Sequence, residues 1–271
     1  MGGGEKRKEM RNYTFFPVSQ GRSLPLKGLT LPELINNQAE RLGEKTLLRF
    51  RDEALSYKDF NEKTDRLAKA FQNLGIKKGD RVAIMFQNCL EVVESYFAIW
   101  KTGAWAVPVN PVFTPHEAEY VLTDSGAKMI VVGEEQYSRI ESIRGKVSSL
   151  GMVILNSDNP TAQVISYNSL TKESQKTEPV DIAPDDVCQI MYTSGTEGRP
   201  KGVMTTHGGY TDNAFIRSTI LELNEKDITL IPLPLFHMFA VSTLLNFITI
   251  GGTVIITERF QTEEVLLTTR W

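Results

Sequence analysis

The chain alternates runs of apolar residues with helix-forming segments, and this alternation restricts its fold more than any other feature. Residues 81–86, 104–109 and 129–132 are rich in apolar residues, as expected of strands buried on both faces. A strongly apolar helical segment, residues 90–101, separates the first two. Apolar strands that are separated by helices predict a mainly parallel sheet with helices on both faces. We therefore expect an α/β fold.

Three segments contain signals for the start of a helix. Thr30-Leu-Pro-Glu33 and Thr114-Pro-His-Glu117 are capping boxes, and Ser56-Tyr-Lys-Asp59 starts with a good N-cap residue. The corresponding helices are expected to extend to about residues 42, 125 and 74, with Gly75 ending the one that follows Ser56.

The chain divides into four parts by composition. Residues 1–29 are predicted to be an N-terminal arm, which lacks the apolar core of a signal peptide. Residues 30–156 form a first α/β block. Residues 157–184 are polar and rich in proline, and we expect a connecting segment with little structure. Residues 185–271 form a second α/β block.

The second block contains one segment that resembles a membrane span. Residues 235–256 are mostly apolar, but the pair Gly251-Gly252 divides them into a helix and the strand 253–257. We expect a core helix followed by a core strand, and no integral membrane segment. Earlier in the block, a helix near 212–221 and a strand at 228–232 are predicted.

A loop rich in glycine and hydroxyl residues follows the apolar run at 188–192. Gly195 and Gly198 allow backbone N–H groups to turn toward an anion, and Lys201 adds a positive charge. A phosphate-binding loop is one interpretation, and a solvated surface turn is the other. The order Pro-Lys-Gly at residues 200–202 excludes a Walker A loop, which needs Gly-Lys-Ser/Thr.

Composition excludes several classes of function. The 30 basic and 33 acidic residues give a net charge of −3, so nothing indicates binding to nucleic acid. Cys89 and Cys188 are interpreted as reduced thiols of a cytoplasmic protein. The histidines, at 116, 207 and 237, have no spacing typical of metal ligands, and no metal site is predicted.

Two motifs in the second block resemble those of the adenylate-forming superfamily, which includes AMP-forming acyl-CoA synthetases, aryl-CoA ligases, luciferase and adenylation domains. Thr193-Ser-Gly-Thr-Glu-Gly-x-Pro-Lys-Gly202 is similar to its signature loop, with Glu197 where Ser or Thr is usual. Leu233-Pro-Leu-Phe-His-Met-Phe239 is similar to its next motif, with Ala240 in place of the usual glycine. The resemblance runs from about Thr30 to the end of the chain.

The resemblance implies the site residues. Those that would bind the β- and γ-phosphates of ATP are Thr193, Ser194, Gly195, Thr196, Glu197, Gly198 and Lys201. Lys201 and His237 would be catalytic, and His237 and Phe239 would contact the acyl group. Two alternatives remain open: His237 as a satisfied core histidine, and Phe239 and Val241 as packing residues. His207 and His116 are interpreted as structural and as a surface residue, respectively, and Arg199 as directed toward solvent.

The resemblance also implies a reaction. A carboxylic acid, expected to be a medium- or long-chain fatty acid, would react with MgATP to give an acyl-adenylate, and CoA would then form the thioester. Mg²⁺ would enter with ATP. By this resemblance the chain is an N-terminal fragment of the family's large domain, incomplete at the C-terminus, and inactive alone. The alternatives are an adenylation domain that loads a carrier protein, and a non-catalytic truncated module that binds a nucleotide or partner. Oligomers are possible.

Overall fold

The computed structural model describes residues 28–157, 164–172, 177–193 and 199–268. Within these residues the helices are α1 (Leu31–Leu42), α2 (Tyr57–Asn73), α3 (Leu90–Lys101), α4 (Pro115–Ser125), α5 (Glu134–Ile143), α6 (Tyr167–Leu170), α7 (His207–Ile220), α8 (Met238–Ile250) and α9 (Thr262–Thr268), with a 3-10 turn η1 (Arg144–Lys146). The strands are β1 (Thr46–Phe50), β2 (Glu53–Ser56), β3 (Arg81–Met85), β4 (Trp105–Pro108), β5 (Met129–Gly133), β6 (Met152–Asn156), β7 (Ile165–Ser166), β8 (Val187–Thr193), β9 (Lys201–Thr206), β10 (Ile228–Ile231) and β11 (Thr253–Ile256).

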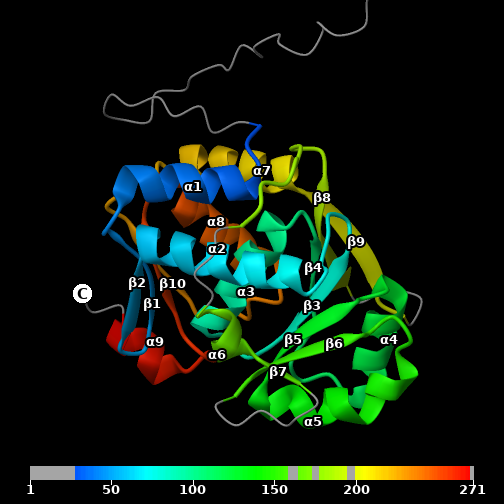
Figure 1. Cartoon of the computed structure of the whole chain (residues 1–271). Coiled ribbons are helices and arrows are strands. Elements are labelled where there is room, and N and C mark those ends of the chain that lie inside the picture. The colour runs from blue at the N-terminus through cyan, green and yellow to red at the C-terminus, as the bar shows by residue number, and fades with distance from the viewer. Residues whose placement is uncertain (1–27, 158–163, 173–176, 194–198, 269–271) are drawn as a thin grey trace, which may run out of the picture.

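The strands form two sheets (Figure 1). The seven-stranded sheet has the order β7-β6-β5-β3-β4-β8-β9, and the four-stranded sheet has the order β10-β11-β1-β2. All pairs are parallel except the two hairpins, β1–β2 and β8–β9. This confirms the predicted α/β class with mainly parallel sheets. Each sheet takes strands from both sequence blocks, so the blocks do not coincide with the sheets.

The capping signals lie where the sequence predicts them. Thr30 and Thr114 form complete capping boxes with Glu33 and Glu117 at the starts of α1 and α4. Ser56 accepts a hydrogen bond from the backbone N–H of Asp59 at the start of α2. These side chains satisfy backbone N–H groups that have no partner within the helix.

The alternation along β3 explains how the seven-stranded sheet is covered. Val82 and Ile84 point into a large core that also contains side chains of α1, α2, α3 and α8. Ala83 and Met85 point into a second core that contains side chains of α4 and α5. Since successive side chains of a strand face opposite sides, the two cores lie on opposite faces of this sheet. Figure 1 shows α4 and α5 on the side away from α2 and α3.

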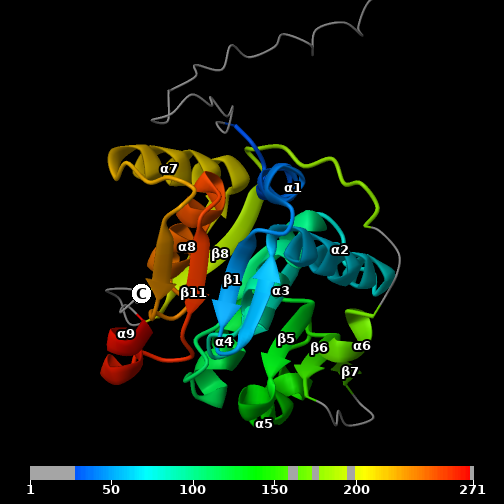
Figure 2. The ribbon, with the colours of Figure 1, turned by 90° about the vertical axis from the view of Figure 1, so that its left-hand side faces the viewer.

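The large core continues to the four-stranded sheet. Strand β1 contributes Leu48, and β11 contributes Val254, to the same cluster as Trp100 of α3. In Figure 2, α7 packs against α8, and α8 lies next to β11, which itself pairs with β1. Helix α8 ends at Gly251, whose φ of 80° is in the left-handed region that glycine adopts easily. The helix and strand expected on either side of Gly251 are thereby confirmed.

Three features differ from the sequence predictions. Helix α7 starts at His207, not near residue 212, because Thr206 caps it by accepting a hydrogen bond from the N–H of Gly209. The β1–β2 hairpin was not predicted, and it is stabilised by pairing of β1 with the distant β11. Within the connecting segment, β7 adds to β6 and α6 follows it. No described helix has the length and apolar character needed to cross a membrane.

Candidate functional site

The β8–β9 hairpin carries both described ends of the candidate phosphate loop. Thr193 ends β8, Lys201 begins β9, and the two residues are partners in the antiparallel register. Side chains of directly paired residues leave the same face of a sheet. Both residues are exposed. A hydroxyl and an ammonium group thus lie together at the mouth of the loop.

The interior of the loop is not described. Residues 194–198 contain Ser194, Gly195, Thr196, Glu197 and Gly198, and all five lie outside the described residues. Their assignment to the phosphates of ATP remains a prediction.

Helix α4 supports the hairpin next to the loop. The hydroxyl of Tyr120 donates a hydrogen bond to the carbonyl of Pro200 (3.0 Å), and that of Tyr192 donates to Asp124 Oδ2 (2.6 Å). The two tyrosine rings meet edge to face, with centroids 6.4 Å apart. The Arg199 guanidinium lies 5.9 Å from the centre of the Tyr120 ring. Burial and the neighbouring Asp124 carboxylate both raise the pKa of the Tyr192 phenol.

Gly202 is required by the packing of the hairpin. A Cβ at this position would lie 2.8 Å from Ile190 Cγ2 and 3.3 Å from Tyr192 Cζ. Real Cβ atoms do not approach another atom as closely as the first of these distances, so Ile190 or the strand would have to shift. The glycine that follows Lys201 therefore allows the two strands to pack closely beneath the loop.

The other end of the hairpin is fixed by His207. This residue is fully buried, and its Nδ1 accepts a hydrogen bond from the backbone N–H of Leu31 (3.3 Å). Burial lowers the pKa of the imidazole to about 4, although the nearby Asp186 carboxylate opposes the shift. The predicted structural role of His207 is therefore confirmed: it joins the start of α7 to the start of α1.

The second motif leads into α8. His237 is the N-cap residue of α8, and its backbone N–H donates to the carbonyl of Pro234 (3.0 Å). The imidazole is exposed and lies beside the Phe236 ring, with centroids 4.2 Å apart. The alternative interpretation of His237 as a satisfied core histidine is therefore wrong.

The two apolar candidates of this motif differ. Phe239 is 59% exposed, with the Arg217 guanidinium 5.4 Å from the centre of its ring. Val241 is fully buried in the large core, so it packs as expected of an ordinary core residue. His116 and Arg199 are exposed, as the sequence predicts.

Both motifs lie at the carboxyl ends of the central strands. Strands β3, β4 and β8 are adjacent and parallel, and Thr193, where the candidate phosphate loop begins, ends β8 at that edge. Leu235 and Phe236 line a small hollow together with Phe86 and Pro108, which follow β3 and end β4. The crevice beyond the carboxyl ends of parallel strands is where α/β proteins usually bind ligands.

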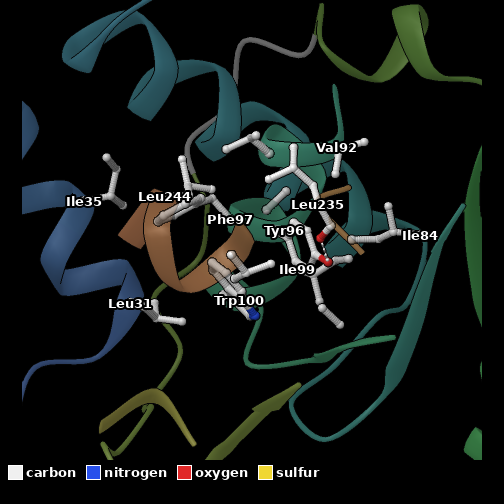
Figure 3. Packing of buried hydrophobic residues seen from close by; sticks show 14 of the residues in the cluster. Leu31, Ile35, Ile84, Val92, Tyr96, Phe97, Ile99, Trp100, Leu235 and Leu244 are labelled. Carbon is white, nitrogen blue, oxygen red and sulfur yellow. Dashed lines mark hydrogen bonds between the residues drawn. The ribbon is translucent and has the colours of Figure 1, made fainter. Parts of the chain in front are cut away.

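A buried aromatic group connects the two motifs (Figure 3). Trp100 Nε1 donates to the carbonyl of Cys188 in β8 (3.0 Å), and its ring stacks on Tyr96 at 5.2 Å. The Tyr96 hydroxyl donates to the carbonyl of Leu235 (2.9 Å), the dashed line in Figure 3. The strand before the phosphate loop and the segment before His237 therefore share one support on α3.

The remaining candidates give no further site. Both cysteines are free, and burial raises the pKa of each thiol. Among the described residues, no group of three or more His, Cys, Asp or Glu side chains is arranged to hold a metal ion.

The residues that support the site were not predicted from the sequence. Tyr120 and Asp124 are four positions apart on α4, a spacing that puts them on one helix face, but this does not indicate which loop they contact. Asn88, which bonds to the segment before His237, occurs in a loop with no motif. Only the folded chain brings these residues to the site.

Sequence comparison with known proteins identifies the family to which the two motifs belong. A family model described as AMP-binding enzyme matches residues 35–270. Long-chain-fatty-acid–CoA ligase FadD13 of Mycobacterium tuberculosis is 33% identical over 218 residues, which are 79% of this chain and 42% of that protein. The 2-succinylbenzoate–CoA ligase of Oceanobacillus iheyensis is 30% identical over 241 residues, 87% of this chain and 46% of that protein.

A solved structure of a CoA ligase has the same fold as this chain. The anthranilate CoA ligase AuaEII, in complex with anthranoyl-AMP, superposes with a TM-score of 0.85 at 27% identity, covering 94% of this chain and 49% of that chain. The chain spans about half the length of the curated relatives it matches. These relatives are acid–CoA ligases, so the resemblance inferred from the two motifs is confirmed.

Proposed function

Because the chain belongs to the AMP-binding enzyme family, we propose that it contributes the ATP-phosphate site of an enzyme that activates a carboxylic acid. The carboxylate oxygen would attack the α-phosphorus of ATP, and the bond from that phosphorus to the bridging oxygen would break to release pyrophosphate. The thiol of CoA would then attack the acyl carbon, with AMP as the leaving group. Mg²⁺ would arrive with ATP, and the reaction would take place in the cytoplasm.

The pairing of Thr193 with Lys201 carries this proposal. Phosphoryl chemistry depends mainly on positioning and on neutralising charge. In our proposal Lys201 neutralises the β- and γ-phosphates, and Thr193 donates a hydrogen bond to them. The loop residues 194–198 complete the cradle. The hairpin register between Gln189 and Thr193 supports this role, since it fixes the distance between the two strands at the mouth of the loop.

We assign the acid to the medium- or long-chain fatty acids. The name of the FadD13 relative, a long-chain-fatty-acid–CoA ligase, supports this choice. The exposed ring of Phe239, two residues after the exposed His237, offers apolar surface for an acyl chain. Other relatives are named for aromatic acids, which makes an aryl acid the competing substrate class.

Carboxylate-dependent ATP–pyrophosphate exchange tests the proposal. In the longer protein to which this chain is expected to belong, exchange should occur with octanoate or palmitate and only weakly with acetate or 4-coumarate. Lys201→Ala should reduce the exchange rate by about 10²-fold, the usual loss when one charge-stabilising group is removed. Lys226→Ala changes an exposed lysine before β10 and should leave the rate unchanged.

Each part of the proposal can fail separately. Exchange that persists undiminished in Lys201→Ala would contradict the role of Lys201. A preference for 4-coumarate would overturn the fatty-acid assignment. If no acid supports exchange and pyrophosphate does not bind to the chain in calorimetry, the phosphate site itself is wrong.

A further inference from the structure

Asn88 lies where the carboxyl ends of the two sheets meet. It is 4% exposed and occurs in the loop between β3 and α3. Its Nδ2 donates to the carbonyls of Leu233 (2.9 Å) and Thr257 (3.1 Å), and its Oδ1 accepts from the backbone N–H of Leu235 (2.8 Å). Leu233 follows β10 and Thr257 follows β11. One side chain of the seven-stranded sheet thus holds two loops of the four-stranded sheet.

The three bonds require a primary amide. Two of the backbone partners are acceptors and one is a donor, and only the amide of Asn or Gln offers both N–H donors and a carbonyl acceptor. A carboxylate could accept from Leu235 but would oppose two carbonyl oxygens. An apolar side chain would leave three backbone groups without these partners, which is costly in a buried position.

The backbone of Leu235 is held from both sides. Asn88 bonds to its N–H, and the Tyr96 hydroxyl bonds to its carbonyl. Figure 3 shows Tyr96 and Leu235 directed toward one another in the buried cluster. Leu235 itself is 1% exposed, whereas His237, two residues later, is exposed. The chain therefore leaves the core over two residues, from a point that side chains have fixed.

We propose that Asn88 is a positioning residue that determines where the His237 imidazole stands at the edge of the acid site. The effect on acid binding rests on the proposed function. The effect of Asn88 on the position of the imidazole does not. The bond to Leu235 sets the start of the Pro234–His237 turn, in which the His237 N–H donates to Pro234. The bond to Thr257 fixes the same turn relative to β11. Without Asn88, the imidazole would occupy a range of positions.

Gln38 provides a matched control at the opposite end of α8. It is 2% exposed, and its Nε2 donates to the carbonyls of Ile248 (2.7 Å) and Thr249 (2.6 Å). Gln38→Ala therefore removes a buried amide with two bonds to backbone carbonyls, as Asn88→Ala does. It leaves the segment before His237 untouched. If the two variants differ in the protection of the Leu235 and His237 amides, the difference reflects the loss of local hydrogen bonds at this segment and not a general loss of stability.

Hydrogen exchange is the first test. In Asn88→Ala, protection of the Leu235 and His237 amides should fall by about tenfold more than that of core amides in β3. The Leu235 amide loses its acceptor, and the turn in which the His237 amide bonds to Pro234 loses its anchor. The Cε1–H signal of His237 in NMR spectra should shift or broaden, while that of the buried His207 stays in place. Equal losses of protection in Asn88→Ala and Gln38→Ala, or an unchanged His237 signal, would overturn the proposal.

Two further variants keep the test decisive. Asn88→Asp preserves the volume and the acceptor for Leu235 but not the two donors, so we expect a displaced His237 signal as well. A His237 signal like that of the wild type in Asn88→Asp would show that the two donated hydrogen bonds do not position His237. That result would contradict the proposal. If Asn88→Ala does not fold, Tyr96→Phe removes the bond to the Leu235 carbonyl and should loosen the same two amides.

The functional consequence is measured separately. Where the wild-type protein shows exchange, Asn88→Ala should raise the KM for the acid by about tenfold and leave the KM for ATP within about twofold, as expected when one subsite is displaced. Equal changes in both constants would contradict the positioning role. If the wild type shows neither exchange nor pyrophosphate binding, the proposed function is rejected, and the hydrogen-exchange result would still decide the structural inference.

Discussion

The two candidate motifs are held in place by different means. The described ends of the candidate phosphate loop lie on a β-hairpin, where backbone pairing sets Thr193 opposite Lys201. The segment before His237 has no strand partner at Leu235, and the side chains of Asn88 and Tyr96 hold its backbone instead. The first support is built from backbone groups that every residue has. The second depends on particular side chains.

The difference has a consequence for how each motif tolerates change. A hairpin ladder survives most side-chain substitutions, provided that the strands can still approach each other. A segment that is held by two buried side chains loses its position when either is removed. We therefore expect the hairpin to be sensitive at few positions and the His237 segment to be sensitive at the residues that bond to Leu235.

Trp100→Ala should have the largest effect, because Trp100 supports both regions. Its indole is fully buried, bonds to Cys188 of β8 and stacks on Tyr96. Removing a buried tryptophan costs about 3–5 kcal/mol. Urea unfolding measures this loss, and amides of both β8 and the segment around Leu235 should lose protection together. A loss confined to one region would show that the two motifs do not share a support.

His207→Asn should change how stability depends on pH. The ordinary pKa of histidine is near 6.5, and burial lowers that of His207 to about 4. Between these values the unfolded state binds a proton that the folded state excludes. The stability from this group is therefore complete above about pH 6.5 and is lost as the pH falls to about 4, a change of about 3 kcal/mol.

Asn is chosen at this position because its side-chain oxygen can accept from Leu31 in place of Nδ1 and does not titrate. The free energies of unfolding of wild type and variant should be measured from pH 7 to pH 4. As the pH falls, the wild type should lose more stability than the variant. A constant difference would mean that His207 is not the group responsible.

Gly202→Val tests close approach within the hairpin. Its side chain would meet Ile190 and Tyr192, and overpacking of this kind costs about 1–3 kcal/mol. Gly145→Ala is the control, because a Cβ there has nothing within 4 Å. Thermal unfolding should show a lowered midpoint for Gly202→Val and little change for Gly145→Ala. Equal midpoints for both variants would mean that the hairpin adjusts without cost.

Tyr120→Phe should have the smallest effect. It removes the hydrogen bond to the Pro200 carbonyl and keeps the ring. The free energy of unfolding should therefore fall by about 0.5–1.5 kcal/mol. Because Pro200 precedes Lys201, affinity for pyrophosphate, measured by calorimetry, should weaken. Tyr137→Phe, which removes a hydroxyl bonded to Glu141 on α5, should leave that affinity unchanged. An unchanged affinity in Tyr120→Phe, or an equal loss in the control, would contradict the role of α4 in supporting the loop.

The sequence predicts most of the central elements because their signals are local. The capping box at Thr30 and the apolar strand of β3 depend on residues within a few positions of each other. The β1–β2 hairpin was missed because β1 gains its stability from β11, about 200 residues away in the chain. The early start of α7 depends on one threonine cap, which local propensity did not reveal.

By itself, the sequence determines which residue types are available for chemistry. The order of glycines, hydroxyls and Lys201, and the second motif around His237, are enough to identify the family. That is possible because polyphosphate recognition needs particular groups at short spacing. The same spacing could not decide between an exposed and a buried His237.

Only the tertiary structure decides how the two motifs are supported and joined. Asn88, Trp100 and Tyr120 belong to elements far from both motifs in sequence, and their roles come from hydrogen bonds across 80 or more positions. Such contacts depend on how the two sheets and α3 pack, because buried backbone groups must find partners wherever the fold places them. The sequence thus specifies which candidate groups are available for chemistry, and the packing of the core specifies where they stand.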